Sequence, residues 1–554
     1  MAIRRMPGGN RYGDRKINSR MSRKLAGLFV VVVLLFVVLA IRITYINAKS
    51  GDQYARQVLA QSQGEYASTI LPFKRGDILD ANGMTLATSE KRYNVILDCK
   101  VVNSDEDYLE PTIEALSEIF DIDVVGVRSL LTDEKTMNSQ YQIVSRNVTI
   151  EQKQDFENYK NPEDKKDLSK EEQARLDAIK GVWFEENYIR VYPFNELACD
   201  VIGFTNGDNS ADWGIEGYYS NTLNGADGRK YGYWSDEDLT QTIVDPTDGR
   251  SLVSTIDINI QRIIEDEIAS FSTKYANGPW GPKAAKNIGV VVMDPNTGEI
   301  LGMGSSDPYD LNNPRDLTAY YTTQEIAAMS DEDKVANLQK LWRNYCISDA
   351  YEPGSVFKPM TVSAAFEDGS LTGMEEYICD GGQEVAGVYI KCSDVNGHGH
   401  ETNLDAIRNS CNDALMQIAE KMGQEEFCKY QRMFNFGSRT GIDLSGEAAG
   451  ILFDASGMSD VDLATSSFGQ GFTCTMIQEI SALASVINGG YYYQPHVISK
   501  VLDSEGATIK TIEPTVQKQT ISEEVSDELR RFMKASVDDG TSVYSKVDGY
   551  SMGG

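Results

Sequence analysis

Residues 352–361 read EPGSVFKPMT and place Ser355 three residues ahead of Lys358, behind a Pro-Gly pair. No other serine in the sequence has a lysine at this spacing. Residues i and i+3 are neighbours on a helix face, so Lys358 can reach the Ser355 hydroxyl if a helix begins here. However, a serine at a helix start is ordinarily an N-cap, and roughly two such pairs are expected by chance at average usage. The surrounding sequence has to decide between a cap and a nucleophile.

The chemistry open to Ser355 depends on a second motif. A free hydroxyl is a poor nucleophile and needs a base, and a lysine serves only if its pKa is lowered enough to populate the neutral amine. Further donors are then expected nearby, to orient the lysine and carry its proton. RNSCNDAL (408–415) supplies Ser410 and Asn412 ahead of a helix-like stretch. In a tight loop before a helix, both side chains can point into one cleft.

Charge is distributed unevenly along the 554 residues, which are long enough for about three or four domains. The composition is globular, with 41% hydrophobic and 24% charged residues. The formal net charge is −31, yet residues 1–24 hold eight basic side chains against one acid. Because such an acidic body is repelled by phosphate backbones, we expect no nucleic-acid partner.

The basic stretch is followed by seventeen residues without a charge, LAGLFVVVVLLFVVLAI (25–41). Roughly 17–25 apolar residues cross a bilayer core, and the flanking RITYINA can extend this run. A cleaved signal peptide is the alternative, but the run is longer than a usual h-region and ITYINAKSG is a poor cleavage site. We therefore expect a cytoplasmic tail (1–24), a single transmembrane helix (25–45) and an exported body anchored in the cell membrane.

Turn and periodicity signals organise the exported body. FKRGDILDANGMTLATS (73–89) predicts strand, turn and strand around Asn82-Gly83, and the charge-rich residues 150–180 predict a solvated helical excursion. SLVSTI leads through Asp257 into an amphipathic helix. The residues expected on its apolar face are Ile260, Ile263, Ile264 and Ile268. NIGVVVMDPNTGEILGMGSS (287–306) predicts a hairpin in a sheet covered on both faces, followed by mainly helical patterns.

Cysteine and histidine spacing gives no metal signature. The eight cysteines are too scattered for a disulfide scaffold, and no C-x-x-C occurs. His398 and His400 alternate in a glycine-rich stretch, but with no third ligand of matching type nearby we predict a plain loop, no metal and no cofactor. Three histidines in the whole chain also make triad chemistry hard to build.

A disulfide bond at the Ser-x-Asn motif is one of two possibilities for the cysteines there. Cys411 lies inside that motif, and Cys392 precedes it in a loop-like stretch on the exported side. A disulfide between them could distort the cleft if their Cα atoms come within about 7 Å. Two reduced cysteines are the other possibility.

Several blocks in fixed order resemble the class B penicillin-binding proteins, the monofunctional peptidoglycan D,D-transpeptidases. The blocks run from about residue 70 to the end of the sequence and read RGDILDANGMTLA, YPFNELACDVIGF, GIEGYY, RNYCISDAYEPGSVFKP, FGSRTGIDLSGEAAG and SFGQGFTCTMIQEISALASVINGG. Ser-x-x-Lys and Ser-x-Asn are motifs of this superfamily. The resemblance implies an α/β protein with a mixed α+β pedestal domain (46–247). A transpeptidase domain (248–554) would follow, with an antiparallel sheet between helices.

The resemblance also implies a two-step acyl transfer. Ser355 would attack the penultimate D-Ala carbonyl of a peptidoglycan stem peptide, and a second stem's amine would take the acyl group. Lys358 would accept the proton, Ser410 and Asn412 would complete the network, and the Ser355 N–H would form half of an oxyanion hole. β-Lactams would acylate the same serine, and a membrane-embedded glycan polymerase would be the partner. A non-catalytic β-lactam sensor or assembly scaffold is the alternative, and the motifs do not separate division, elongation and sporulation.

The family's third motif, Lys-Thr-Gly, would be expected directly after Gly554. The resemblance therefore implies a sequence that stops before the last three of five sheet strands. We expect the hairpin at 287–306 to keep an unpartnered edge. We also expect the 554 residues as written not to turn over.

Overall fold

The computed structural model describes residues 34–35, 67–234, 239–276 and 285–554. The predicted cytoplasmic tail lies outside these residues, as does the predicted transmembrane helix apart from Leu34 and Leu35. Within the described ranges, no helix combines the length and the apolar character needed to cross a membrane.

Two compact units make up the chain. The described part of the first unit is a three-stranded antiparallel sheet with the strand order β1-β6-β7. Its strands are β1 (Ala67–Leu71), β6 (Gly228–Trp234) and β7 (Leu239–Val244). The described residues of 72–227 and 246–554 form the second unit, which holds every candidate site residue.

A seven-stranded sheet runs through the second unit with the order β17-β16-β8-β2-β3-β4, and β5 also pairs with β3. Its strands are β2 (Ile78–Leu79), β3 (Thr85–Leu97), β4 (Gln142–Val148), β5 (Val182–Val191), β8 (Ser251–Ser254), β16 (Ile498–Leu502) and β17 (Thr508–Thr511). The strands before residue 247 and those after it meet in the parallel pair β2–β8. The predicted pedestal and transpeptidase segments therefore share one backbone ladder.

The strand–turn–strand predicted over 73–89 is confirmed, because β2 and β3 pair antiparallel around Asn82-Gly83. Gly83 has a φ of +87°, which a residue without a Cβ adopts at little cost. Asp80 Oδ1 accepts from the N–H groups of Asn82 (2.8 Å) and Met84 (2.7 Å), so a side chain holds the turn.

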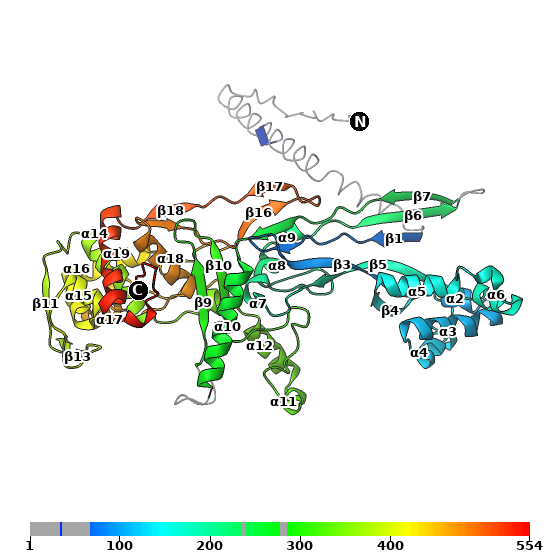
Figure 1. Ribbon diagram of the computed structural model, residues 1–554, viewed down its shortest axis with the longest axis horizontal. Helices are drawn as coiled ribbons and strands as arrows, with labels where there is room; N and C mark the ends of the chain where they lie inside the picture. The colour runs from blue at the N-terminus through cyan, green and yellow to red at the C-terminus, as the bar shows by residue number, and fades with distance from the viewer. Residues whose placement is uncertain (1–33, 36–66, 235–238, 277–284) are drawn as a thin grey trace, which may run out of the picture. The chain divides into compact units, whose positions relative to one another are not determined.

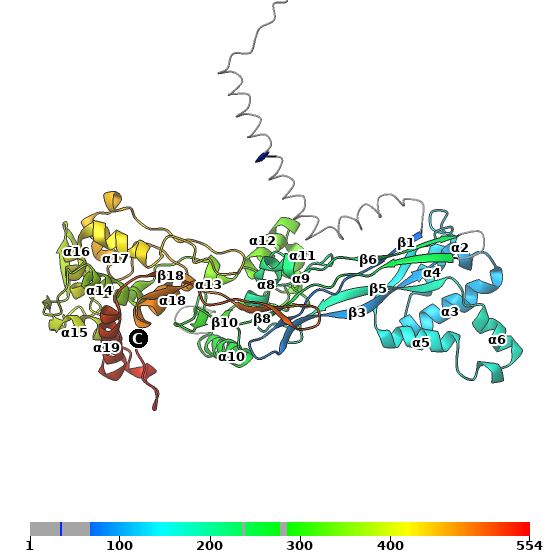
Figure 2. The same cartoon turned by 90° about the horizontal axis from the view of Figure 1, so that it is seen from above.

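Small helices cluster near one end of the β3–β5 ladder (Figures 1 and 2). They are α2 (Cys99–Val102), α3 (Leu109–Phe120), α4 (Val124–Thr132), α5 (Ile150–Lys160) and α6 (Lys170–Asp177). Helices α5 and α6 occupy the charge-rich stretch, and each buries one side chain, Phe156 and Leu176 respectively. The predicted solvated excursion is thus confirmed, and its charges face water.

Helix α10 (Ile258–Tyr275) begins as predicted, with Asp257 accepting from the N–H groups of Asn259 and Ile260. Its predicted apolar face is partly wrong, because Ile263 is 62% exposed. Ile263 lies one residue, about 100°, from buried Ile264, and Gln261 takes the inner position. The Gln261 amide exchanges two hydrogen bonds of 2.8 Å with the Met303 backbone, which satisfies it there.

The predicted hairpin consists of β9 (Gly289–Met293) and β10 (Ile300–Ser305), paired antiparallel. Helix α10 packs against β10, helix α18 (Met476–Ile487) packs against β9, and Figure 1 shows the hairpin between them. In the described part of the chain no third strand joins this sheet, and an isolated bridge links Glu299 to His496. All five residues of β9 are only half-buried, so this strand is less covered than its apolar sequence predicts.

The rest of the second unit is mainly helical, as predicted. Its helices of more than one turn are α11 (Thr323–Ala328), α12 (Asp331–Leu341), α14 (Lys358–Glu367), α15 (Asn403–Arg408), α16 (Asn412–Met433), α17 (Asp460–Ser466) and α19 (Glu523–Asp539). One-turn helices are α7 (Cys199–Ile202), α8 (Gly214–Tyr218), α9 (Ser220–Leu223) and α13 (Tyr345–Ser348). Short strands are β11 (Glu376–Cys379), β12 (Gly382–Val385), β13 (Val388–Lys391), β14 (Gly399–Thr402), β15 (Tyr491–Tyr493) and β18 (Val516–Gln519). Phe357 anchors the core of this part, with its ring edge-on to the rings of Phe427, Phe436 and Phe472.

Candidate active site

Ser355 lies in a 3-10 turn (Gly354–Phe357) that runs directly into α14, whose first residue is Lys358. No side chain caps either element, so Ser355 is not an N-cap. Ser355 is exposed, and among the described residues its hydroxyl has no hydrogen-bond partner, whereas Lys358 is only 2% exposed. The serine thus faces solvent while the lysine behind it is enclosed.

Two glycines fix the turn that presents Ser355. Gly354 has a φ of +65°, and its N–H donates to the Gly469 carbonyl at 2.9 Å. Gly469 has a φ of +84°, and a Cβ there would lie 2.1 Å from the Gly354 oxygen. Gly354 favours glycine because of its left-handed φ. Gly469 favours glycine for the same reason, and also because any side chain there would push the two backbones apart.

The Lys358 amine is held by the backbone and the side chain of Ser410. Its Nζ donates to the Ser410 carbonyl at 2.6 Å and to the Ser410 Oγ at 2.9 Å. Burial lowers the pKa of Lys358 to about 8, although the nearby Cys392 and Cys411 groups act against this shift. A usable fraction of neutral amine is then present near neutral pH, which a lysine base requires.

The Ser-x-Asn motif spans the junction between α15 and α16. Ser410 has a φ of +52°, an uncommon conformation for a residue with a Cβ, of the kind found at functional sites. The Ser393 hydroxyl also donates to the Ser410 carbonyl, at 3.1 Å. Asn412 begins α16, and its Nδ2 donates to the Lys391 carbonyl at 3.5 Å, its one hydrogen bond to a described residue.

A cavity of about 260 Å³ joins three of the four predicted site residues, Ser355, Lys358 and Ser410. Asn412 is not among its lining residues. The sequence did not point to three further hydroxyl-bearing residues that line it, Ser536, Thr541 and Ser542. They come from the end of α19 and the turn after it, and no motif marks them because they reach the site only through packing of α19 against α14 and α15.

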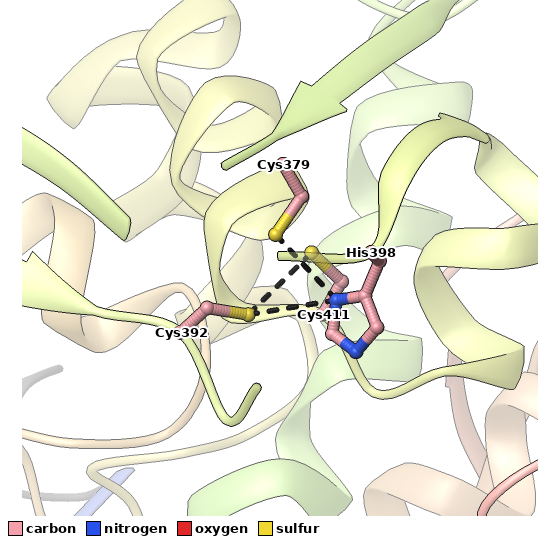
Figure 3. Close-up of side chains that lie close together, drawn as sticks. All are labelled: Cys379, Cys392, His398 and Cys411. Atoms are coloured by element: carbon pink, nitrogen blue, oxygen red, sulfur yellow. Dashed lines mark hydrogen bonds between the residues drawn. The ribbon is translucent and has the colours of Figure 1, made fainter. Parts of the chain in front are cut away.

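A second group of reactive side chains lies behind the motif. We call this group the cysteine–histidine cluster, and its members are Cys379, Cys392, His398 and Cys411 (Figure 3). The three cysteine sulfurs and a histidine ring nitrogen all lie within 4.8 Å of one another. His398 is in a loop, as predicted, but the expectation that it has no matching ligand nearby is wrong. The missing signal is non-local, because the other three residues reach the loop from separate elements of the fold. His400 is exposed on strand β14 and is not part of this cluster.

Comparison with known proteins identifies two domains. The family model for the penicillin binding protein transpeptidase domain matches residues 288–554, and the penicillin-binding protein dimerisation domain matches residues 70–253. Stage V sporulation protein D of Bacillus subtilis (strain 168) is 32% identical over 551 residues, which cover 98% of this chain and 76% of that protein. Peptidoglycan D,D-transpeptidase FtsI of Buchnera aphidicola is 25% identical, with 83% of this chain and 72% of that protein covered.

Among solved structures, penicillin binding protein 2X from Streptococcus thermophilus superposes with a TM-score of 0.65 at 23% identity. The match covers 85% of this chain and 66% of that one. At this identity the likeness concerns the fold.

Proposed function

Because this chain belongs to the class B penicillin-binding proteins, we propose that it is a peptidoglycan D,D-transpeptidase with Ser355 as its nucleophile. The observation that carries the proposal concerns the buried Lys358 amine. It donates hydrogen bonds to Ser410, and Lys358, Ser410 and the exposed Ser355 line one cavity. A serine hydroxyl, a lysine with a lowered pKa and a second hydroxyl are the groups that acyl transfer without histidine requires. This arrangement supports catalysis rather than a structural role for Ser355.

The reaction runs in two steps. The Ser355 oxygen attacks the penultimate D-Ala carbonyl carbon, and its proton moves to Lys358, with the Ser410 hydroxyl as relay. The peptide bond to the terminal D-Ala breaks, and the departing amine takes up a proton. The amine of a second stem peptide then attacks the Ser355 ester, which forms the cross-link and returns the proton to the serine.

Asn412 belongs to this proposal as a substrate-amide ligand. Among the described residues its side-chain amide meets one acceptor, the Lys391 carbonyl, at the outer limit of hydrogen bonding. A modest rotation would free the amide, and catalytic hydrogen bonds commonly tighten only when substrate is bound.

Release of D-Ala together with cross-linked dimer tests the proposal. The protein, purified in detergent and given pentapeptide stems on lipid-linked glycan, should produce both. A β-lactam sensor or an assembly scaffold would produce neither, although a sensor would still be acylated by penicillin. Acylation without D-Ala release would therefore favour the sensor.

The 554 residues contain no Lys-Thr-Gly motif. We expect these residues alone to release D-Ala at least about 10²–10³-fold more slowly than a chain that carries the motif, because losing one oxyanion donor has that effect. Equal rates for the two chains would show that the motif is dispensable here.

We further propose a single-pass membrane protein with an exported body and a membrane-embedded glycan polymerase as its partner. The uncharged residues 25–41 behind a basic tail support this topology, and so does a substrate that lies outside the membrane. Protease added to intact protoplasts should remove the body and spare the tail.

Similarity to a sporulation protein of B. subtilis supports a role in sporulation rather than division or elongation. Timing of expression would test that role.

Replacing Lys358 with arginine should slow penicillin acylation by about 10²–10⁴-fold, because an always-protonated guanidinium cannot accept the Ser355 proton. Stopped-flow measurement of acylation would give the rate. Lys429→Arg is the matched control, since Lys429 pairs with Glu426 on the exposed side of α16. A wild-type rate in a folded Lys358→Arg variant would remove the lysine from the mechanism.

A further inference from the structure

The cysteine–histidine cluster is assembled from four separate places in the fold (Figure 3). Cys379 ends β11, Cys392 follows β13, His398 lies in the loop before β14, and Cys411 is the N-cap of α16. The three cysteines are at most 4% exposed, and the histidine is half-buried. Each side chain turns inward, so the reactive atoms share one small volume rather than facing solvent.

The spacing of these atoms matches the edges of a zinc tetrahedron. With Zn–S of about 2.3 Å and Zn–N of about 2.0–2.1 Å, tetrahedral geometry places two sulfurs about 3.8 Å apart and a sulfur and a nitrogen about 3.6 Å apart. The Cys392 and Cys411 sulfurs lie 3.7 Å apart. The His398 Nδ1 lies 3.5 Å from the Cys379 sulfur and 3.7 Å from the Cys392 sulfur. Three hydrogen-bond-range contacts thus have the lengths that a bound metal would impose.

The groups around the cluster favour a bound cation. The Cys411 sulfur accepts from the Ala414 N–H at 3.3 Å, at the positive end of the α16 dipole. Glu401 is buried beside the cluster, with its Oε1 3.9 Å from the His398 Nδ1 and its Oε2 without a hydrogen-bond partner in the described part of the chain. A buried carboxylate with an unpaired oxygen is unfavourable unless positive charge lies close.

We propose that the cysteine–histidine cluster binds one Zn²⁺ ion as a structural Cys₃His site. Three sulfurs and one imidazole are a donor set typical of closed, four-coordinate zinc, with no position left for water. On binding, each thiol gives up its proton to solvent, and no electron moves. The site is therefore structural, and the ion takes no part in acyl transfer.

The zinc site positions the Ser-x-Asn motif, a consequence that rests on the proposed function. Cys411 stands between Ser410 and Asn412, so an ion bound to its sulfur fixes the turn that holds the Lys358 amine. Ser410 keeps a left-handed conformation in that turn, and a cross-link one residue away holds it there. The alternative of a disulfide between Cys392 and Cys411 excludes zinc, because it would consume two of the four ligands. In the structure both cysteines are free thiols, with their sulfurs 3.7 Å apart.

Metal content of the full chain, purified without a metal-affinity step, tests the site. We expect about one zinc per wild-type chain by elemental analysis. His398→Ala should lose the ion, whereas His400→Ala, two residues away on exposed β14, should retain it. Replacement of zinc by Co²⁺ should give the visible absorption of a tetrahedral thiolate complex in the wild type and in His400→Ala only.

Three outcomes would overturn the proposal. The first is metal-free wild type with four unreacted thiols, and the second is metal-free wild type with its mass lower by two hydrogen atoms, which assigns the disulfide instead. The third is equal zinc content in His398→Ala and His400→Ala.

Removing zinc with a chelator should also slow penicillin acylation on the order of 10–100-fold, with recovery on adding zinc. An unchanged rate would overturn the positioning role alone, since metal content is measured independently of Ser355 chemistry.

Discussion

Replacing Ser355 with alanine should abolish covalent labelling by a fluorescent penicillin, because the oxygen that opens the β-lactam ring is removed. The fold should not change, since Ser355 is exposed and its hydroxyl makes no hydrogen bond within the described residues. Surface substitutions of this kind usually change the free energy of unfolding by about 0.5 kcal/mol or less. Gel fluorescence after labelling, together with the thermal midpoint, would measure both effects.

Ser370→Ala is the matched control for this experiment. Ser370 lies in the turn after α14 and outside the cavity, and its hydroxyl has no partner in the described part of the chain. This variant should label like the wild type. Persistent labelling of folded Ser355→Ala would show that another hydroxyl is the nucleophile. The cavity residues Ser410 and Ser542 would then be tested first.

Local signals predicted the elements that carry the site. The Asn82-Gly83 turn, the Asp257 cap and the start of α14 near Ser355 each depend on a few neighbouring residues, so the sequence alone specifies them. The meeting of Lys358 with Ser410 was predicted through motif order and family resemblance, since nothing in the spacing of residues 52 apart requires contact. Its geometry became visible only in the fold.

Non-local packing accounts for what was missed. Gln261, and not the predicted Ile263, lies on the buried face of α10, because the Met303 backbone satisfies its amide. The members of the cysteine–histidine cluster are spread over residues 379–411, so they form no C-x-x-C or His-x-x-x-His motif that would indicate a metal site in the sequence. The cavity hydroxyls from α19 depend on helix packing, which a single sequence does not reveal.

Two of the quoted sequence blocks and strand β5 meet in a buried charge cluster within the pedestal segment. Arg75 comes from RGDILDANG, Glu216 from GIEGYY, and Arg190 from β5. Glu216 accepts from Arg75 Nε at 2.7 Å and from Arg190 Nε at 2.6 Å. The side chains of Arg75, Glu216 and Arg190 are 1%, 0% and 4% exposed. One carboxylate thus pairs with two guanidinium groups away from water.

Replacing Glu216 with alanine should destabilise the second unit by at least about 3–5 kcal/mol, because two buried guanidinium groups lose their counter-ion. Since folded proteins are stable by only about 5–15 kcal/mol, we expect a large fall in the urea midpoint or aggregation on purification. Glu186→Ala is the matched control, because Glu186 pairs with Lys91 on the same sheet with both side chains over 40% exposed. That variant should lose about 1 kcal/mol or less. Equal midpoints for the two variants would mean that water reaches the guanidinium groups once the carboxylate is gone, and the charge cluster would then not be what ties the pedestal motifs together.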